Sequence, residues 1–206
     1  MLPDTILHIA NEEEFHWLLQ PELKAIKDGL IYVEDKHWFD DYVGYYRGYL
    51  NAQGQRQGVG IMIDEYYRKF IGEWHEDYEH GIGKIDWNNG YSNWGQYKND
   101  NKEGFSTTKY SDERVNYNQF KNDKLNGYGI ETYADGRVYR GEFKNDWHHG
   151  YGLMKFWNND EYDGQWKYHR KHGEGVFKEA STGRVERRLY ENDKVIEVLE
   201  VIEQGH

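Results

Sequence analysis

The chain has 206 residues and a mass of 24.8 kDa, a size that suits one domain or one repeat array and leaves little room for a large catalytic domain beside it. It contains no cysteine, which excludes disulfide bonds, thiolate zinc sites and cysteine nucleophiles. Its formal net charge of -11 argues against nucleic acid and anionic lipid as main partners, because like charges repel at long range.

Aromatic residues make up 17% of the chain, whereas all hydrophobic residues together reach only 37%. A thick aliphatic core is therefore not expected. The chain has 23 glycines but 2 prolines, and disordered linkers this rich in glycine usually carry more proline and fewer rings. The sequence has no run of about 18 apolar residues and no basic signal sequence, so we expect a folded, soluble, cytoplasmic protein.

The first predicted segment, residues 1–45, is a helical cap followed by a lead-in to the rest of the chain. Asn11 and Glu14 form a capping box, and the apolar residues after them recur at helical spacing. We therefore predict helical structure over 11–28, which Pro21 splits or restarts. Residues 30–46 are predicted to be a strand or an irregular lead-in, because they lack the pattern that follows.

Residues 46–194 are predicted to be a repeat array of six units and a half-unit, with a period of 23 residues from the second unit on. An anchor glycine is followed two residues later by a large apolar side chain, and nine and eleven residues later by further glycines. A one-residue insertion displaces the latter to Gly58 and Gly60 in the first unit, and Ser106 and Asn118 replace glycines in the third and fourth units. The anchors are Gly48, Gly72, Gly95, Asn118, Gly141 and Gly164, and the rings that follow the last five are Trp74, Tyr97, Phe120, Phe143 and Trp166. A period this regular predicts that every unit is the same small structure.

Each unit is predicted to be a β-hairpin. Tyr139, Gly141 and Phe143 alternate with polar residues, which places all three on one face of a strand, and residues 150–156 repeat that alternation. Asn-Asp pairs within the units and Asn-Gly or Asp-Gly pairs between them have the chemistry of turns. Glycine inside a strand usually marks a close approach by another group, so we expect flanking rings to lie across the bare backbone.

The last predicted segment, residues 195–206, is a tail. Val195, Leu199 and Ile202 would share one side of a helix over 195–203, although the same stretch also suits an edge strand; we favour the helix. Repeat arrays need ends that cover the open sheet edge. The N-terminal and C-terminal segments are therefore expected to be caps, with partner-binding helices as the alternative.

The pattern of ring, glycine and ring, followed by Gly-x-Gly and a turn near Asp-Gly, resembles the MORN (membrane occupation and recognition nexus) repeat. The resemblance extends over 46–185, with departures at Asn93, Ser106, Asn116 and Asn118. It implies a mainly β fold, an elongated twisted antiparallel sheet that grows hairpin by hairpin, to which the terminal segments add short helices. Proteins of this family serve as scaffolds in cytoskeletal and ciliary structures such as radial-spoke heads, and some contact membranes.

The resulting expectation is a non-enzymatic scaffold or adaptor in a multi-subunit assembly, in a cytoskeletal or ciliary (axonemal) setting. Partner proteins are expected to contact one aromatic face, because rows of Tyr and Trp are favoured at protein interfaces, while the same rings also stack over glycines. The predicted partner-binding residues are Tyr97, Phe120, Phe143, Trp166, Tyr133 and Phe156.

The alternative is a peripheral membrane adaptor that binds acidic phospholipids. Residues 137–188 carry 11 basic and 8 acidic side chains, a net charge of +3, and clustered cations gain about 1 kcal/mol each near anionic lipid. The predicted lipid-binding residues are Arg140, Lys167, Arg170, Lys171, Arg187 and Arg188.

No catalytic, metal or cofactor site is predicted, and neither nucleic acid nor a small-molecule substrate is expected. The Gly-x-Gly strings precede no Gly-Lys-Ser/Thr and no predicted helix, so they do not indicate a nucleotide site, and the serines lack a nucleophile elbow. His80, His149 and His172 recur at one repeat position, where successive hairpins place them in a row rather than around a metal. His148 and His169 are predicted to lie in exposed loops and to make that edge sensitive to pH.

Overall fold

The computed structural model describes residues 29–38, 44–64 and 66–204; of residues 34–38 and Gly44 it describes the backbone alone. All regular secondary structure in these residues is β-strand, which confirms the mainly β fold. Within this part of the chain no helix is long and apolar enough to span a bilayer. The chain divides into two compact units, Met1–Glu113 and Arg114–His206. The helical segment predicted over 11–28 lies outside the described residues.

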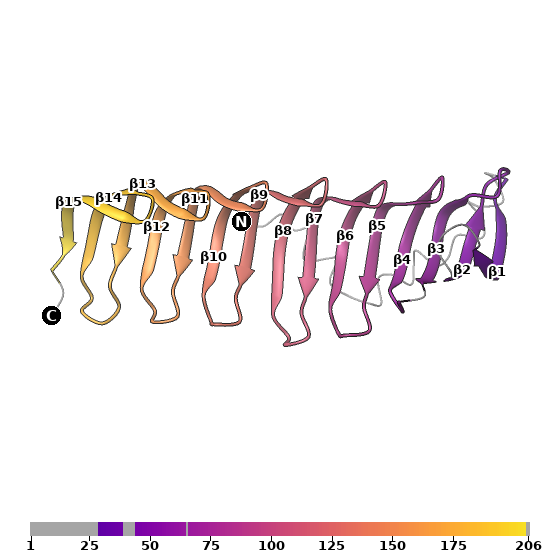
Figure 1. Cartoon of the computed structure of the whole chain (residues 1–206), viewed down its shortest axis with the longest axis horizontal. Helices are drawn as coiled ribbons and strands as arrows, with labels where there is room; N and C mark the ends of the chain where they lie inside the picture. The colour runs from indigo at the N-terminus through magenta and orange to yellow at the C-terminus, as the bar shows by residue number, and fades with distance from the viewer. Residues whose placement is uncertain (1–28, 39–43, 65, 205–206) are drawn as a thin grey trace. The chain divides into compact units, whose positions relative to one another are not determined.

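In each unit the strands pair antiparallel with their neighbours in chain order, as consecutive hairpins do (Figure 1). The first unit contains β1 (Ile31–Trp38), β2 (Gly44–Leu50), β3 (Arg56–Asp64), β4 (Lys69–His75), β5 (Tyr78–Asp86), β6 (Ser92–Lys98) and β7 (Asn101–Lys109). The second contains β8 (Val115–Lys121), β9 (Lys124–Thr132), β10 (Val138–Lys144), β11 (Trp147–Lys155), β12 (Glu161–Lys167), β13 (Arg170–Lys178), β14 (Val185–Glu191) and β15 (Lys194–Glu203). The predicted fold of hairpin after hairpin is thus confirmed within each unit.

The second strand of a repeat is bent by a β-bulge near its start. In the hairpin of β10 and β11 the register shifts after Gly141, so that Glu142 alone faces three residues of β11. Gly150 lies in this bulge with a φ of +62°, which glycine adopts without strain. The Glu142 carboxylate accepts a 3.0 Å hydrogen bond from the Tyr151 N–H and so holds the bulge in place. Figure 1 shows β9, β11 and β13 curving at this edge of the second unit.

The core of each unit consists of aromatic rings that lie over glycines. Tyr139 is fully buried, and a Cβ added to Gly141 or Gly152 would overlap its ring. Tyr162 and Phe70 cover the glycine pairs of their own repeats in the same way. Burying one large apolar side chain stabilises a fold by about 1.5–3 kcal/mol. Bare glycine backbone therefore lets a single layer of strands bury rings on itself, as the sequence predicted.

Successive hairpins are joined along one edge by aspartate clamps. Asp146, in the loop between β10 and β11, accepts a 2.8 Å hydrogen bond from the Leu125 N–H and donates its own N–H to the Leu125 carbonyl at 3.0 Å. Asn145 and Asp146 have φ values of +49° and +71°, a left-handed conformation that Asn and Asp tolerate better than other side chains. Equivalent clamps are made by Asp77, Asp100 and Asp193. The recurrent Asn-Asp pair therefore both turns the chain and joins neighbouring repeats.

The C-terminal helix that we favoured over 195–203 is wrong, because these residues belong to strand β15, which pairs with β14. The edge of β14 presents backbone N–H and C=O groups that a neighbouring strand satisfies and a helix would leave open. The register of this pair shifts at three points, so it is less regular than the repeat hairpins. Within 30–46 the strand alternative holds, since β1 pairs with β2.

Candidate interaction surfaces

Four of the six predicted partner-binding rings are buried in the core. Tyr97, Phe120, Phe143 and Trp166 expose only between 4% and 8% of their surface. Trp166 contacts two tyrosine rings edge-on, with centroids 5.5 and 5.2 Å away, and its Nε1 donates a 2.8 Å hydrogen bond to the Gly152 carbonyl. Such contacts make these rings part of the packing. Partner binding by these four rings stays a prediction. It requires that a partner contact the small part of each ring that is exposed.

The other two predicted rings, Tyr133 and Phe156, are half-buried at the ends of β9 and β11. The Tyr133 hydroxyl donates a 2.6 Å hydrogen bond to the Glu131 carboxylate and lies 2.9 Å from Nε2 of His148. Burial raises the pKa of Tyr133 far above its usual value, and the Glu131 carboxylate adds to this effect. Phe156 lies with its ring centroid 5.1 Å from the Lys171 ammonium. Both rings are thus held by contacts within the unit.

A buried histidine lies among the rings of the second unit. The prediction that His148 lies in an exposed loop is wrong, because β11 begins before it and His148 is only 4% exposed. It pairs across the strands with Phe143 and stacks on Tyr139, with ring centroids 3.7 Å apart. Burial acts to raise the pKa of Glu131, but hydrogen bonds from His148 and Tyr133 lower it below its usual value. This repeat therefore buries an imidazole at the position where the repeats before and after it have Leu125 and Lys171.

Two of the predicted lipid-binding cations point toward the ring-bearing face. Burial lowers the pKa of Lys171, although Asp193 acts in the opposite direction. Arg188 lies 4.5 Å from the centroid of Phe177 and forms a 2.6 Å ion pair with Glu186. The Nζ atom of Lys171 lies between 5.1 and 5.4 Å from the centroids of four rings, Phe156, Tyr162, Phe177 and Tyr190. These cations stabilise the core through cation–π contacts.

The six predicted lipid-binding residues do not share one surface. Arg140 and Arg187 alternate with ring-face residues and so lie on the opposite face of the sheet. Lys167 and Arg170 are exposed and pair with each other across the strands at the loop edge. Only these last two lie together, because they stand at the loop end of paired strands, whereas Arg140 and Arg187 pair with Leu153 and Val176 in the middle of theirs.

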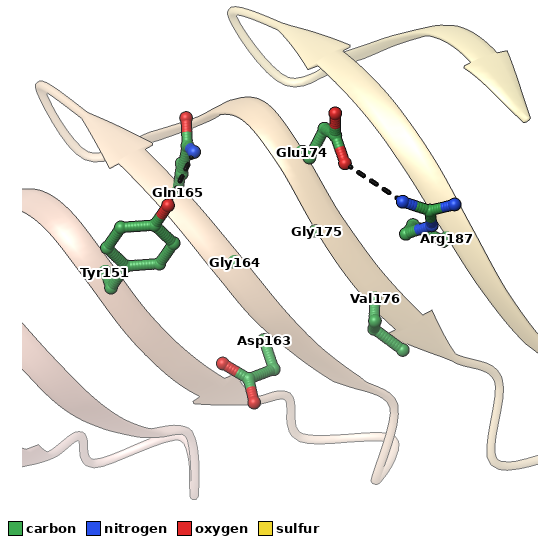
Figure 2. Close-up of a pocket in the computed structure, with 8 residues that line it drawn as sticks. All are labelled: Tyr151, Asp163, Gly164, Gln165, Glu174, Gly175, Val176 and Arg187. Atoms are coloured by element: carbon green, nitrogen blue, oxygen red, sulfur yellow. Dashed lines mark hydrogen bonds and ion pairs between the residues drawn. The ribbon is translucent and has the colours of Figure 1, made fainter. Parts of the chain in front are cut away.

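The face opposite the rings carries an open depression in the second unit (Figure 2). Tyr151 is 62% exposed there and accepts a 2.9 Å hydrogen bond from Nε2 of Gln165. Glu174 and Arg187 form an ion pair of 3.4 Å. A ring beside charged groups suits contact with side chains of another protein. The lining residues are Tyr151, Asp163, Gly164, Gln165, Glu174, Gly175, Val176 and Arg187.

The loop between β12 and β13 departs from the Asn-Asp pattern. Tyr168 and His169 occupy its two left-handed positions, with φ values of +51° and +62°. Nδ1 of His169 accepts a 3.1 Å hydrogen bond from the His148 N–H, so an imidazole replaces the carboxylate of the clamp. Burial, with a smaller effect of His148, lowers the pKa of His169.

Beside this loop stands an exposed ring from the preceding hairpin. The Trp147 centroid lies 6.0 Å from that of Tyr168 and 5.0 Å from that of His169. Trp147 is 45% exposed and Tyr168 is 58% exposed. We call Trp147, Tyr168, Lys167 and Arg170 the loop-edge patch. Sequence reasoning missed its two rings, although the signal was present as Tyr-His at a repeat position that the other three loops of this unit fill with Asn-Asp.

The recurring histidines His80, His149 and His172 are half-buried, one in each of three hairpins, and their Nδ1 atoms have no hydrogen-bond partner among the described residues. Across the described ranges no three His, Cys, Asp or Glu side chains gather in a way that would hold a metal ion.

These features define an array of antiparallel β-hairpins in which rings cover glycines at a fixed spacing. The MORN repeat model matches four segments of the chain, residues 70–90, 119–136, 139–160 and 162–178. The chain therefore carries MORN repeats, as the sequence pattern predicted. No curated protein matches it.

Solved structures that resemble this chain include two complexes. One is the TCP domain of SAS-4 (dCPAP) with a proline-rich motif of Ana2 (dSTIL) from Drosophila melanogaster, at 13% identity and a TM-score of 0.41, covering 70% of this chain and 78% of that one. Another is the TCP10 domain of CPAP with a peptide of STIL from Danio rerio, at 14% identity and a TM-score of 0.34, covering 82% and 99%. At these scores the likeness carries no conclusion about this chain.

Proposed function

We propose that this chain is a non-enzymatic scaffold or adaptor that binds partner proteins within a larger, multi-subunit assembly. The supporting observation is that large rings stand exposed on hydrogen-bonded hairpins, outside the packed core. In the second unit these are Tyr128, Trp147, Tyr151, Trp157 and Tyr168. Tyr and Trp are enriched among the residues that contribute most to protein binding. Rings held on a sheet also lose little conformational freedom on binding, which favours affinity.

We further propose a cytoplasmic setting within a cytoskeletal or ciliary structure. The support is the MORN repeat itself, since proteins with such arrays serve as scaffolds there. A fluorescent fusion of the full chain in ciliated cells tests this setting. Signal along axonemes or at another cytoskeletal structure is expected, and an even distribution through the cell would contradict it.

Affinity purification of the tagged full chain under mild salt tests the binding function. We expect a defined set of proteins to elute in fixed ratios to the chain. The double variant Tyr128→Ser/Tyr151→Ser alters two exposed rings, so circular dichroism should stay β-type while part of the set is lost. Trp166→Ala is a control for unfolding, because it removes a buried ring. Absence of any co-purifying protein, or reproducible turnover of a substrate, would overturn the proposal.

Binding of acidic phospholipids remains the second candidate. It is less well supported, because of the six cations proposed for it only Lys167 and Arg170 lie together on an exposed edge. Flotation with acidic vesicles at physiological salt separates the two candidates. Recovery that disappears in Lys167→Glu/Arg170→Glu would favour the membrane function.

A further inference from the structure

We propose that the loop-edge patch of the second unit is a docking site for an acidic peptide segment of a partner protein, one that carries an aromatic or aliphatic anchor residue. This inference rests on the proposed scaffold function and gives it a surface and a chemistry. The patch lies where the hairpins β10–β11 and β12–β13 end, and its residues are Trp147, Tyr168, Lys167 and Arg170.

The first observation is that the loop between β12 and β13 has Tyr168 and His169 in place of the usual turn residues Asn and Asp. Tyr168 has a φ of +51°, a conformation that disfavours bulky side chains. Three other loops of the same unit place Asn and Asp at the corresponding positions, with φ values between +49° and +71°. Residues held in a disfavoured conformation cluster at functional sites, where surrounding structure maintains them. Here the result is a tyrosine ring in solvent beside a second exposed ring.

The second observation is the pair of rings itself. Trp147 and Tyr168 come from successive hairpins and meet edge to face, with an interplanar angle of 88°. His149 extends the ring cluster, with its centroid 5.8 Å from that of Tyr168. Exposed rings on rigid strands can receive an apolar side chain at small entropic cost. They supply the contact for the anchor residue of the peptide.

The third observation is positive charge that the unit does not neutralise. Lys167 and Arg170 lie directly opposite each other across the strands, an arrangement that is unfavourable for like charges. Neither forms an ion pair within the described part of the unit, and residues 167–172 include no Asp or Glu. The loop acids Asp146 and Asp193 accept backbone N–H groups of the preceding hairpins. Glu191 faces Lys194 across the strands of the next hairpin. An incoming carboxylate would relieve this repulsion.

The neighbouring hairpins continue the charge along the same edge. Lys144 flanks the loop before Trp147, and Lys121 pairs across the strands with Lys124 one hairpin earlier. Because successive hairpins are two strand spacings apart, these cations recur about every 10 Å. An extended peptide rises about 3.3 Å per residue, so carboxylates at every third position would meet successive hairpins. The spacing therefore favours an extended acidic segment.

The loop between β4 and β5 in the first unit has a different character. Residues 75–79 contain three acidic side chains and neither lysine nor arginine. Of these, Glu79 turns inward to form a buried ion pair with Arg68 at 2.7 Å. An acidic peptide would be repelled from that loop. The β4–β5 loop therefore lacks the charge of the proposed docking site. The β6–β7 loop carries Lys98 and Lys102, but Asn99 and Asp100 stand where the patch has Tyr168 and His169.

Selection of peptides tests this inference directly. A displayed library of random peptides, about twelve residues long so that each can span three hairpins, is selected against the full chain. Enriched peptides are then measured by fluorescence anisotropy. We expect them to be acidic, to contain an aromatic or aliphatic residue, and to bind more weakly as salt rises from about 0.05 M to about 0.5 M. No enrichment, or enrichment without acidic bias, would overturn the proposal.

Charge reversal locates the binding surface. In Lys167→Glu/Arg170→Glu the affinity for an enriched peptide should fall about tenfold or more, because the carboxylates of the peptide would then face glutamates instead of cations. The matched control Lys155→Glu/Lys178→Glu makes the same change in net charge at the far ends of β11 and β13. It should change the affinity less than about twofold, since distant charges are screened. Equal effects of both double variants would refute the patch.

Restoring the common loop separates binding from packing. Tyr168→Asn/His169→Asp introduces the residues that three other loops of the unit carry, so the melting temperature should stay the same or rise. Peptide affinity should nevertheless fall about tenfold, because the exposed ring is lost and a carboxylate is added beside Lys167 and Arg170. A lower melting temperature, or unchanged affinity, would show that the Tyr-His loop serves another purpose.

Two further outcomes bear on the class of ligand. Tighter binding of a fluorescent oligothymidylate, or of vesicles with acidic phospholipid, than of any enriched peptide would overturn the assignment to a protein partner. Peptides that bind equally well to all patch variants would refute this site but leave the scaffold function standing, because they must bind elsewhere on the chain. The co-purification experiment decides that function independently.

Discussion

The hairpins β6–β7 and β10–β11 have the same strand arrangement, but the interior of the first is polar and that of the second is aromatic. In β10–β11 the ring of Tyr139 lies over the bare backbone of Gly152. In β6–β7 the corresponding positions hold Asn93 and Ser106, and both side chains are buried. A buried polar group is costly unless it is hydrogen-bonded. The polar side chains buried in β6–β7 must therefore form hydrogen bonds that the aromatic interior of β10–β11 does not require.

It does so through one network around Asn93. Its Nδ2 donates hydrogen bonds to the Thr107 carbonyl at 3.2 Å and to Oγ1 of Thr108 at 2.8 Å. Its Oδ1 accepts from the Tyr97 hydroxyl at 2.7 Å and from Oγ of Ser106 at 2.9 Å. The comparison teaches that the repeat requires a filled interior rather than an apolar one. It also indicates that ring and glycine must change together, because the Cβ of a serine takes the space of the ring.

Exchange of the two interiors should give the largest effect. Tyr139→Asn removes a fully buried ring and leaves an amide without the threonine and serine partners, so we expect a loss of about 4 kcal/mol in the free energy of unfolding. Urea unfolding followed by circular dichroism measures it. In the polar repeat, Asn93→Tyr should also destabilise the fold, and adding Ser106→Gly should recover part of the loss. No recovery in the double variant would contradict the coupling of ring and glycine.

A side chain on the covered glycine should be nearly as damaging. Gly152→Ser places a Cβ against the Tyr139 ring, which is fully buried, and we expect a loss of about 3 kcal/mol. The reverse change, Ser106→Gly, removes the hydroxyl that donates to Asn93 Oδ1 and lies 3.3 Å from the Trp94 carbonyl, and should cost about 1 kcal/mol. Thermal melts of the two variants provide the comparison. Equal shifts in Tm would mean that the interiors tolerate exchange.

A shape-matched apolar residue tests the polar network. Asn93→Leu leaves the Tyr97 and Ser106 hydroxyls without their shared acceptor, so we expect a loss of about 2 kcal/mol. The control Tyr139→Phe removes only the 2.9 Å hydrogen bond from its hydroxyl to the Glu142 carbonyl and should cost about 1 kcal/mol. Denaturant midpoints of both variants decide the matter. A stabilised Asn93→Leu variant would show that the network is not required.

The smallest expected effect concerns the two kinds of clamp. Burial lowers the pKa of His169 below the 6.5 of a free imidazole, so the folded chain binds fewer protons there than the unfolded chain. The stability that this group contributes is complete above pH 6.5 and is lost as pH falls below it. A protonated Nδ1 also cannot accept the His148 N–H.

In His169→Asp a carboxylate takes over this clamp, as Asp146 does one hairpin earlier. Urea midpoints measured from about pH 8 to about pH 5.5 should therefore fall less steeply in the variant than in the natural chain. The same slope in both proteins would mean that His169 does not control stability in this range.

Much of the fold was accessible from local pattern. The period of 23 residues and the alternation of Tyr139, Gly141 and Phe143 predicted hairpins with rings and glycines on one face, because strand geometry alone requires it. The MORN resemblance followed from the same spacing. The alternation also predicted that these rings share one face and stack over glycines, but how deeply each is buried depends on how closely the next hairpin packs.

Other features depended on neighbours. The stretch 195–203 suits a helix or a strand by its own pattern, and the open edge of β14 decided for the strand. His148 was assigned to a loop because Asn145 and Asp146 marked a turn, yet β11 begins immediately after them. Trp147 and Tyr168 were not singled out, because their proximity arises only when two hairpins lie side by side.

The amino-acid sequence by itself determined the repeating hairpin and the pairing of ring with glycine, because both follow from spacing within one unit. Only the tertiary structure decided which rings are buried, which cations point inward and which side chains gather at the loop edge. Those properties depend on the hairpins to either side, which supply the atoms that cover a side chain or leave it in water.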